Sequence, residues 1–551
     1  MITLKKKLLK GFVGVMGLAI GVSLLASCDM SLAPTYERND KETSAEIPAS
    51  VTPTPSRTPT STPTTTTSTK EEYTITYDTQ GGSAISPSKS ADGSVNKVND
   101  PIKDGYTFDG WYLNGHRFSF DTTINSNITL KAGWIKPINV SISSILSGNG
   151  KTYNEPFMFN EKAFNHDSDV YDKDIAMFAM GSSFVNNGSK TTLDFFKGFN
   201  FDNVKNLPSE EEYDGICFTF AHKELDKSDL FVASVKGFDY GQEWAGNFNV
   251  GKTGNHYDFD RSAGIVFDAL KKYVNDNKVT NNVKLLLTGY SRGGAVANLL
   301  ADKVLSATDK ITLDKNVYAY TFEAPKGMLK ENAKEYKNVF NIVNNADIIT
   351  KIVPDSFGFA RCGIDINIYS DKIDELLNTF DNGFVINKFT SSSDYTNEDE
   401  HSNYIIDNIF MYTDTYGDYV DCEIKDRDTF VDNFGDEIQF IMKIVFGIKP
   451  VTRVAIMADV TSKGMMDLAM LLFTPNGIHD YIKPFLDNDG IKYDDNDLLK
   501  VCNKIPNILA SRGTIVSIAM NQEKKANVIR MIGMHYPIIN YVLFKNYEYK
   551  A

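Results

Sequence analysis

The chain has 551 residues, of which 42% are hydrophobic and 12% aromatic, so it is long enough for several globular domains with large cores. Its formal net charge of −14 argues against nucleic acid as a partner, because phosphate binding requires a basic surface. The cysteines are widely spaced and form no CxxC pair, so the sequence supports no metal site and leaves disulfides open: Cys28, Cys217, Cys362, Cys422 and Cys502.

The first 28 residues have the pattern of an export signal. Lysines precede the apolar run 11–26, which is too short and wrongly flanked for a membrane span. The run ends in Leu25-Ala26-Ser27-Cys28, which resembles the lipobox of bacterial lipoproteins. The resemblance implies cleavage before Cys28, lipid attachment to its sulfur and anchoring on the extracellular face of the cell membrane. The alternative is a plain secretory signal with an incidental cysteine.

Residues 29–70 are dominated by threonine, serine and proline. Such a segment cannot bury a core. We expect an extended linker that holds the folded part away from the membrane surface.

Residues 71–135 predict a small all-β domain, because β-branched and aromatic residues alternate between glycine-rich turns. The segments YDTQGG, GYTFDGWY and ITLKAGW resemble the internalin-type B repeat, a β-grasp-like module of bacterial surface proteins. Trp111 and Trp134 are expected in its core, with a ligand platform as the alternative. Residues 73–134 would then serve as a spacer or as a contact to the cell surface or cell wall.

Residues 140–551 alternate apolar strands with amphipathic helices, which predicts a parallel sheet covered by helices. Strands are expected at 230–235, 317–322 and 339–343, and a helix at 262–274. Another strand, Leu285 to Leu287, stops at Gly289-Tyr290-Ser291-Arg292-Gly293, and a helical pattern follows immediately.

That junction makes Ser291 a candidate nucleophile. A serine on a tight strand-to-helix turn is exposed at the sheet edge, and glycines two positions away on either side remove side chains that would clash there. The alternative is an ordinary turn with an incidental serine.

Five segments follow one another as in the class 3 lipases: VKGFDYGQEWAGNF, GNHYDF, TGYSRGGAVANLLA, TFEAPKG and FNIVNNADIITKIVP. The resemblance covers residues 174–365 and implies an α/β-hydrolase fold with Ser291 as nucleophile and Asp347 as triad acid. Serine requires an imidazole that takes its proton and a carboxylate that holds the imidazole. Asp347 as a turn or capping residue is the alternative.

The oxyanion hole would use the backbone N–H of Arg292 and, by the same resemblance, that of Phe238. The sequence departs from the family here. Lys236 replaces the usual arginine, and Phe238 replaces a serine or threonine, so no side-chain hydroxyl is available.

The histidine is not fixed by local pattern. Chain order leaves His401, His479 and His535 after the acid. We favour His535, which resembles the His-x-Pro motif near the C-terminus of longer bacterial relatives, over His401, with His479 third. Choosing His535 makes residues 370–530 a helical insertion placed to cap the site.

The sequence thus predicts an α/β-hydrolase with a helical C-terminal cap, preceded by a small all-β (β-grasp-like) repeat domain. The implied function is a surface-anchored serine hydrolase that cleaves carboxylic esters of lipids or a small ester, needs no metal or cofactor, contacts the membrane through a lipid on Cys28 and binds no nucleic acid. Two alternatives remain: a non-catalytic adhesion protein on a degraded hydrolase scaffold, and an esterase acting on cell-envelope or peptide substrates.

Overall fold

The computed structural model describes residues 72–143, 151–185, 190–207, 216–237, 246–279, 282–382, 384, 386–410, 426–432, 440, 444, 447–449, 451–452, 455–456, 459, 471, 474, 476–511 and 522–549. The expected signal and linker, residues 1–70, lie outside the described residues, and Cys28 with them. Phe238 and Cys422 also lie outside them. Within those ranges, no helix has the length and apolar character needed to cross a membrane.

The centre of the molecule is a seven-stranded sheet in the order β16-β14-β12-β11-β10-β9-β8. Strands β10, β11, β12, β14 and β16 pair in parallel, whereas β9 is antiparallel to both of its neighbours. The strands are β8 (Asp202–Leu207), β9 (Phe218–Glu224), β10 (Ser228–Val235), β11 (Asn282–Tyr290), β12 (Val317–Phe322), β14 (Val339–Val343) and β16 (Ile364–Asn367). The strands expected at 230–235, 317–322 and 339–343 are confirmed.

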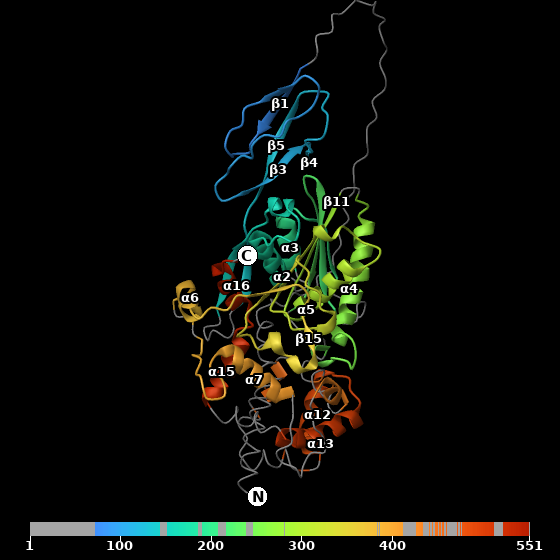
Figure 1. Ribbon diagram of the computed structural model, residues 1–551, viewed down its shortest axis with the longest axis vertical. Helices are drawn as coiled ribbons and strands as arrows, with labels where there is room; N and C mark the ends of the chain where they lie inside the picture. Colours follow the sequence, from blue (N-terminus) through green and yellow to red (C-terminus); the bar gives the residue numbers. More distant parts are fainter. Residues whose placement is uncertain are drawn as a thin grey trace, which may run out of the picture.

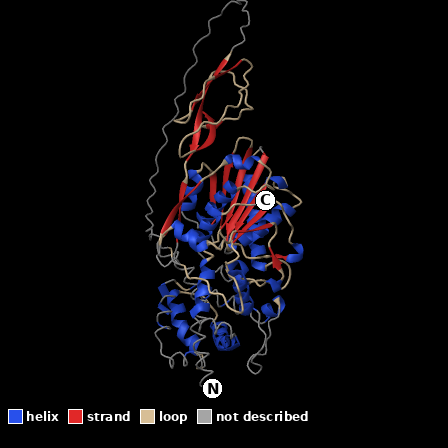
Figure 2. Ribbon diagram, turned by 60° about the vertical axis from the view of Figure 1, so that its left-hand side comes forward, coloured by secondary structure: helices blue, strands red, loops and turns tan. Residues whose placement is uncertain are grey.

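Helices cover both faces of this sheet (Figure 2). Successive strand side chains point to opposite faces, so Leu286 packs on one core and Leu285 and Leu287 on the other. The first core lies under α2 (Lys173–Val185), α3 (Lys190–Gly198) and α16 (Pro537–Asn546), and the second under α4 (Tyr257–Asp276) and α5 (Arg292–Ser306). Burial on both faces explains why these strands are continuously apolar in sequence.

The N-terminal module is a separate five-stranded sheet in the order β2-β1-β5-β3-β4, seen at one end of the molecule in Figure 1. Trp111 is buried in its core and Trp134 packs against that core, in agreement with the structural interpretation of both residues. The strands are β1 (Tyr73–Asp78), β2 (Ser88–Ser90), β3 (Thr107–Leu113), β4 (His116–Arg117) and β5 (Ile128–Ile135). The hairpin β6 (Ile138–Ser143) and β7 (Thr152–Phe157) follows it.

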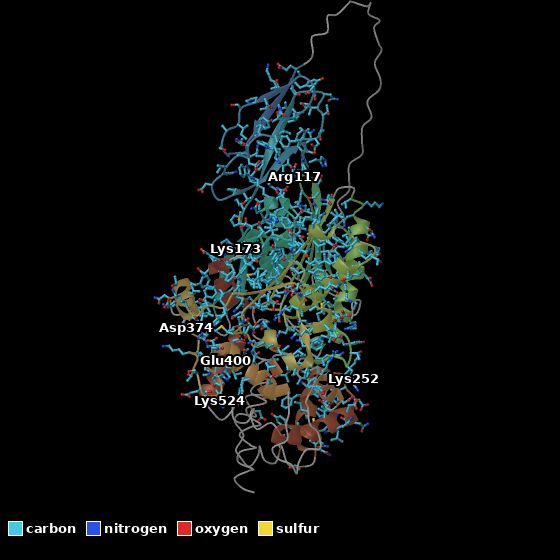
Figure 3. The ribbon with its side chains drawn as sticks, in the orientation of Figure 1. Arg117, Lys173, Lys252, Asp374, Glu400 and Lys524 are labelled. Atoms are coloured by element: carbon cyan, nitrogen blue, oxygen red, sulfur yellow. The ribbon has the colours of Figure 1, made fainter. Side chains whose placement is uncertain are left out.

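A buried ion cluster joins this module to the domain of the seven-stranded sheet. The Asp109 Oδ1, on β3, forms an ion pair with the Lys223 Nζ of β9 at 3.1 Å. The same oxygen lies 3.6 Å from the Arg117 Nη1. Arg117, labelled at the junction in Figure 3, also pairs with Glu161. Asn200 adds a hydrogen bond to Asp109 at 2.9 Å. The module is therefore docked on the domain of the seven-stranded sheet, a contact that its sequence did not predict.

The elements described between β16 and α16 are all helices, joined by loops such as residues 386–397. Helices α7, α12, α13 and α15 gather at the end of the molecule opposite the N-terminal module (Figure 1). The helices are α6 (Ile373–Phe380), α7 (Glu398–Phe410), α8 (Arg427–Phe430), α12 (Gly477–Asp489), α13 (Asp495–Ser511) and α15 (Gln522–Gly533). Short pieces elsewhere are β13 (Met328–Leu329), β15 (Phe359–Ala360) and the 3₁₀ turns η3 (Glu161–Asn165), η5 (Asp314–Asn316), η6 (Lys330–Asn332), η7 (Ile349–Lys351) and η8 (Asp355–Phe357).

Candidate active site

Ser291 occupies a strained turn between β11 and α5. Its backbone has φ 56° and ψ −127°, a region that residues other than glycine rarely adopt. Its N–H donates to the carbonyl of Phe322 at 2.8 Å, which ties the turn to the neighbouring strand β12. The strand-to-helix turn predicted from the sequence is thus present.

The glycines around Ser291 are required by close backbone packing. A Cβ on Gly289 would overlap the backbone of Gly293 one turn later, and a Cβ on Gly293 would overlap the carbonyl of Val235. Gly237 lies against the carbonyl of Tyr290 with the same lack of space. The end of β10 therefore approaches the turn as closely as backbone atoms allow.

His535 bridges Ser291 and Asp347. Its Nε2 lies 2.7 Å from the Ser291 Oγ, and its Nδ1 lies 2.6 Å from the Asp347 Oδ2. The Asp347 side chain is fully buried, and that of His535 is 16% exposed. An imidazole held between a hydroxyl and a carboxylate can take the serine proton and keep the resulting charge beside the carboxylate.

Several backbone contacts fix the acid and the imidazole. Asp347 follows β14, and its Oδ1 accepts the N–H of Ile349 at 2.8 Å. His535 lies in the turn between α15 and α16, where its carbonyl accepts the Tyr290 hydroxyl at 2.6 Å. Asn540 of α16 donates to that hydroxyl at 2.7 Å. The loop carrying the imidazole is therefore attached to Tyr290, the residue just before Ser291.

Burial shifts the pKa values of both His535 and Asp347. Desolvation lowers the pKa of His535 to about 4, so the imidazole is neutral and able to act as a base at neutral pH. Desolvation also raises the pKa of Asp347, and this is opposed by the Ile349 N–H and by the charges of Lys351 and Arg361. The donors and cations around Asp347 favour its ionised form.

Arg292 contributes differently through its backbone and its side chain. As the first residue of α5, it has an N–H without an acceptor inside the helix, next to the candidate nucleophile Ser291, where an oxyanion could accept it. Its guanidinium is buried and pairs with Asp258 of α4 at 2.6 Å, which joins α5 to α4. The second expected donor, Phe238, lies outside the described residues, directly after Gly237.

The other histidines have no contact with Ser291. His401, the alternative base, is buried in α7 and stacks on Tyr395, and neither of its ring nitrogens has a hydrogen-bond partner among the described residues. His479 lies in α12 between Asp480 and Asp495. His256 is buried and stacks on Phe259. His535 is the histidine that the fold brings to Ser291.

Sequence reasoning missed a second buried carboxyl at the site. Glu323 follows β12, is 0% exposed and lies within hydrogen-bonding reach of the Asp347 carboxyl. An acidic residue directly after an apolar strand, in Thr321-Phe322-Glu323, was the available signal.

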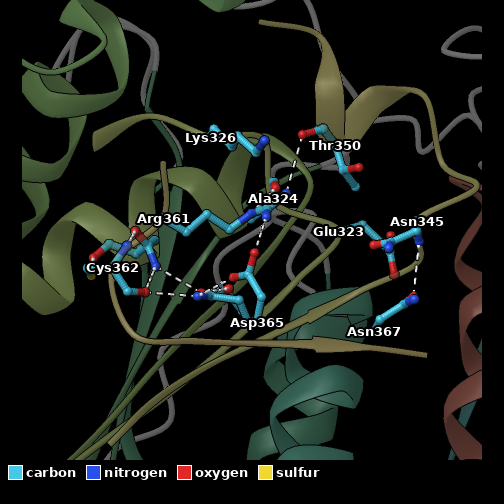
Figure 4. A network of polar contacts seen from close by, with 12 residues as sticks. Glu323, Ala324, Lys326, Asn345, Thr350, Arg361, Cys362, Asp365 and Asn367 are labelled. Atoms are coloured by element: carbon cyan, nitrogen blue, oxygen red, sulfur yellow. Dashed lines mark hydrogen bonds and ion pairs between the residues drawn. The ribbon is translucent and has the colours of Figure 1, made fainter. Parts of the chain in front are cut away.

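A polar network supports the strand ends behind the acid (Figure 4). The Arg361 Nε donates to the carbonyl of Ala324 at 2.7 Å, and its Nη1 lies 2.7 Å from Asp365. The N–H of Asn345 donates to the Asn367 side chain at 3.3 Å. Within the described part of the chain, no cluster of three or more His, Cys, Asp or Glu could hold a metal ion.

Two segments match known families. Residues 73–133 match the Listeria-Bacteroides repeat domain, and residues 233–357 match the class 3 lipases. The second match contains Ser291 and Asp347 and ends before His535. It supports a lipase-type ester hydrolase on an α/β-hydrolase fold. No curated protein matches the chain.

Solved lipases are similar to part of the chain. A triacylglycerol lipase described as having a serine protease triad as its catalytic centre is 20% identical, with 37% of this chain and 83% of that chain covered and a TM-score of 0.30. The triacylglyceride lipase of Rhizomucor miehei is 17% identical over 37% and 83% of the two chains, with a TM-score of 0.27. The Lip2 lipase of Yarrowia lipolytica is 16% identical over 42% and 83%, with a TM-score of 0.25.

Proposed function

We propose that this protein is a serine hydrolase that cleaves carboxylic esters of lipids through an acyl-enzyme formed on Ser291. The observation that carries the proposal is the continuous contact from the Ser291 Oγ through His535 to Asp347. The class 3 lipase match over residues 233–357 supports the choice of esters as substrates.

The reaction follows from these contacts. Ser291 attacks the ester carbonyl while the His535 Nε2 takes its proton, and Asp347 stabilises the imidazolium that forms. The N–H group of Arg292 stabilises the negative oxygen of the tetrahedral intermediate, and the family resemblance implies the N–H of Phe238 as the second donor. His535 then returns the proton to the leaving alcohol, and a water molecule, activated by the same imidazole, releases the acid and regenerates the serine.

The helices between β16 and α16 act as a cap in this proposal. Lys351, two residues after Ile349, donates to the Asp399 carbonyl of α7 at 3.0 Å, and the N–H of Ile348 donates to the carbonyl of Met531 in α15 at 3.4 Å. The segment is therefore in contact with the loop that carries the acid. An apolar cover at this position would hold an acyl chain and exclude water.

The N-terminal features complete the proposal. Lipid attachment to Cys28 would anchor the chain on the outer face of the cell membrane, with residues 29–70 as a linker. The internalin-type repeat at residues 73–134 would contribute contact with the cell surface. Labelling with radioactive palmitate, with Cys28→Ser as control, tests the anchor: no difference between the two chains would exclude it.

Hydrolysis of p-nitrophenyl esters of graded chain length by the full chain tests the activity. We expect turnover that rises with chain length beyond acetate and is absent in Ser291→Ala. Absence of turnover by the unmodified chain with every ester would contradict the proposal and favour an adhesion protein on a hydrolase scaffold.

A further inference from the structure

Glu323 is held at the end of β12 by two backbone contacts. Its N–H donates to the carbonyl of Ile342 at 2.9 Å, and its Oε2 accepts the N–H of Asn344 at 3.0 Å. Both partners belong to β14 or to the loop leading to Asp347. The side chain therefore points toward the triad acid rather than into solvent.

The backbone of Glu323 is strained. Its φ is 47°, a left-handed conformation that is strained for glutamate and unstrained for glycine. A residue that keeps a large side chain in such a conformation, fully buried and at a candidate active site, indicates a role for that side chain.

The two carboxyl groups need a proton between them. The Glu323 Oε1 is buried and has no hydrogen-bond partner among the described residues, although it belongs to a group within hydrogen-bonding reach of Asp347. Two carboxylates within hydrogen-bonding reach of each other cannot both stay ionised when both are fully buried. A proton on Oε1 removes one charge and supplies the missing hydrogen bond.

The surroundings place that proton on Glu323. Asp347 receives the N–H of Ile349 and the Nδ1 of His535, and Lys351 and Arg361 stabilise its charge. Glu323 receives the Asn344 N–H, while burial and the nearby Asp347 raise its pKa well above the ordinary value. The charge therefore stays on the carboxylate that faces the imidazole.

We propose that Glu323 is a positioning residue that, as a neutral carboxylic acid, donates a hydrogen bond to Asp347 and fixes the triad carboxylate against His535. The inference rests on the proposed function. It also predicts an alkaline limit to activity: loss of the Glu323 proton would add a second negative charge beside Asp347 and break their hydrogen bond.

Glutamine is the discriminating substitution, because its carbonyl can accept the Asn344 N–H while its amide donates to Asp347. At pH 7 we expect kcat of Glu323→Gln within about threefold of the unmodified chain, and kcat of Glu323→Ala lower by about tenfold or more with KM changed less than about twofold. The alkaline fall in kcat/KM should disappear in Glu323→Gln. In the matched control Glu398→Gln, which alters a buried carboxyl paired with Arg530, the alkaline fall should stay.

Three outcomes would overturn the inference: full activity in Glu323→Ala, an equal loss in a folded Glu323→Gln, or an unchanged alkaline fall in Glu323→Gln. Infrared difference spectra of the full chain at pH 8 provide a readout without turnover. The spectrum of the unmodified chain minus that of Glu323→Gln should contain the carbonyl band of a protonated carboxylic acid, and its absence would also overturn the inference. This band decides the matter if Glu323→Ala fails to fold. A chain that shows the band and hydrolyses no ester would refute the proposed function alone.

Discussion

Two groups of buried carboxyls in the molecule have opposite kinds of neighbours. At the junction with the N-terminal module, Asp109 and Glu161 face the cations Arg117 and Lys223. At the candidate active site, Asp347 contacts an imidazole and lies within reach of a second carboxyl.

The difference distinguishes a contact that holds two domains together from a site that can carry out a reaction. Cations beside buried acids balance their charge, and the ion pairs at the junction can hold two domains together. Asp347 instead faces the neutral imidazole of His535, so its negative charge can stabilise an imidazolium when His535 takes a proton.

The largest effect should come from removing the imidazole. We expect His535→Ala to lower kcat/KM by about 10⁴-fold or more, because Ser291 loses its base. His401→Ala is the matched control, and kcat/KM should stay within a few-fold because His401 contacts Tyr395 and not the serine. Ester hydrolysis assays on both variants check this. The opposite pattern would move the base to His401.

Neutralising one acid in each region sharpens the comparison. Asp347→Asn should reduce kcat by about 10³- to 10⁴-fold, since the imidazolium loses its carboxylate, and the melting temperature should change little. Asp109→Asn should leave kcat intact and destabilise the chain by about 3 kcal/mol, since Lys223 and Arg117 keep buried charges without this partner. Parallel kinetics and thermal unfolding measure both. Equal effects of the two substitutions on activity would erase the distinction.

The acid limb of the pH profile should be displaced. Because burial lowers the pKa of His535 to about 4, kcat/KM should hold as pH falls past 6.5 and decline only in the range approaching 4, where the base becomes protonated. An acid limb centred at or above 6.5 would contradict the burial argument.

The same shift affects stability. The unfolded chain binds a proton on this histidine near the ordinary value of about 6.5, and the folded chain binds it only near 4, so the free energy of unfolding should decrease as pH falls through this interval. In His535→Gln this part of the decrease should be missing, as urea titrations at several pH values would detect. An identical slope in both chains would count against it.

Local sequence signals located the candidate nucleophile but not the whole candidate site. The turn at Ser291 was predictable because its glycines, strand and helix lie within a few residues of one another. His535 is 188 residues from Asp347 along the chain, so its selection over His401 depended on resemblance to longer relatives, and only the packing of α15 and α16 brings it to the serine.

Two features were missed for a physical reason. Glu323 has a sequence context that equally suits a turn residue, and its burial becomes visible only when β12 and β14 are paired. Asp109 and Arg117 occupy a small β module in which charged side chains usually face solvent, and it is the docked domain that covers them. Both depend on tertiary contacts that local patterns do not encode.

The most direct test of the central claim is covalent labelling of the full chain with an organophosphonate ester, followed by peptide mass spectrometry. We expect one label per chain on the Ser291 Oγ, no label in Ser291→Ala, and labelling slowed by orders of magnitude in His535→Ala but not in His401→Ala. Labelling of another residue, or labelling of Ser291 at the same rate without His535, would contradict the account.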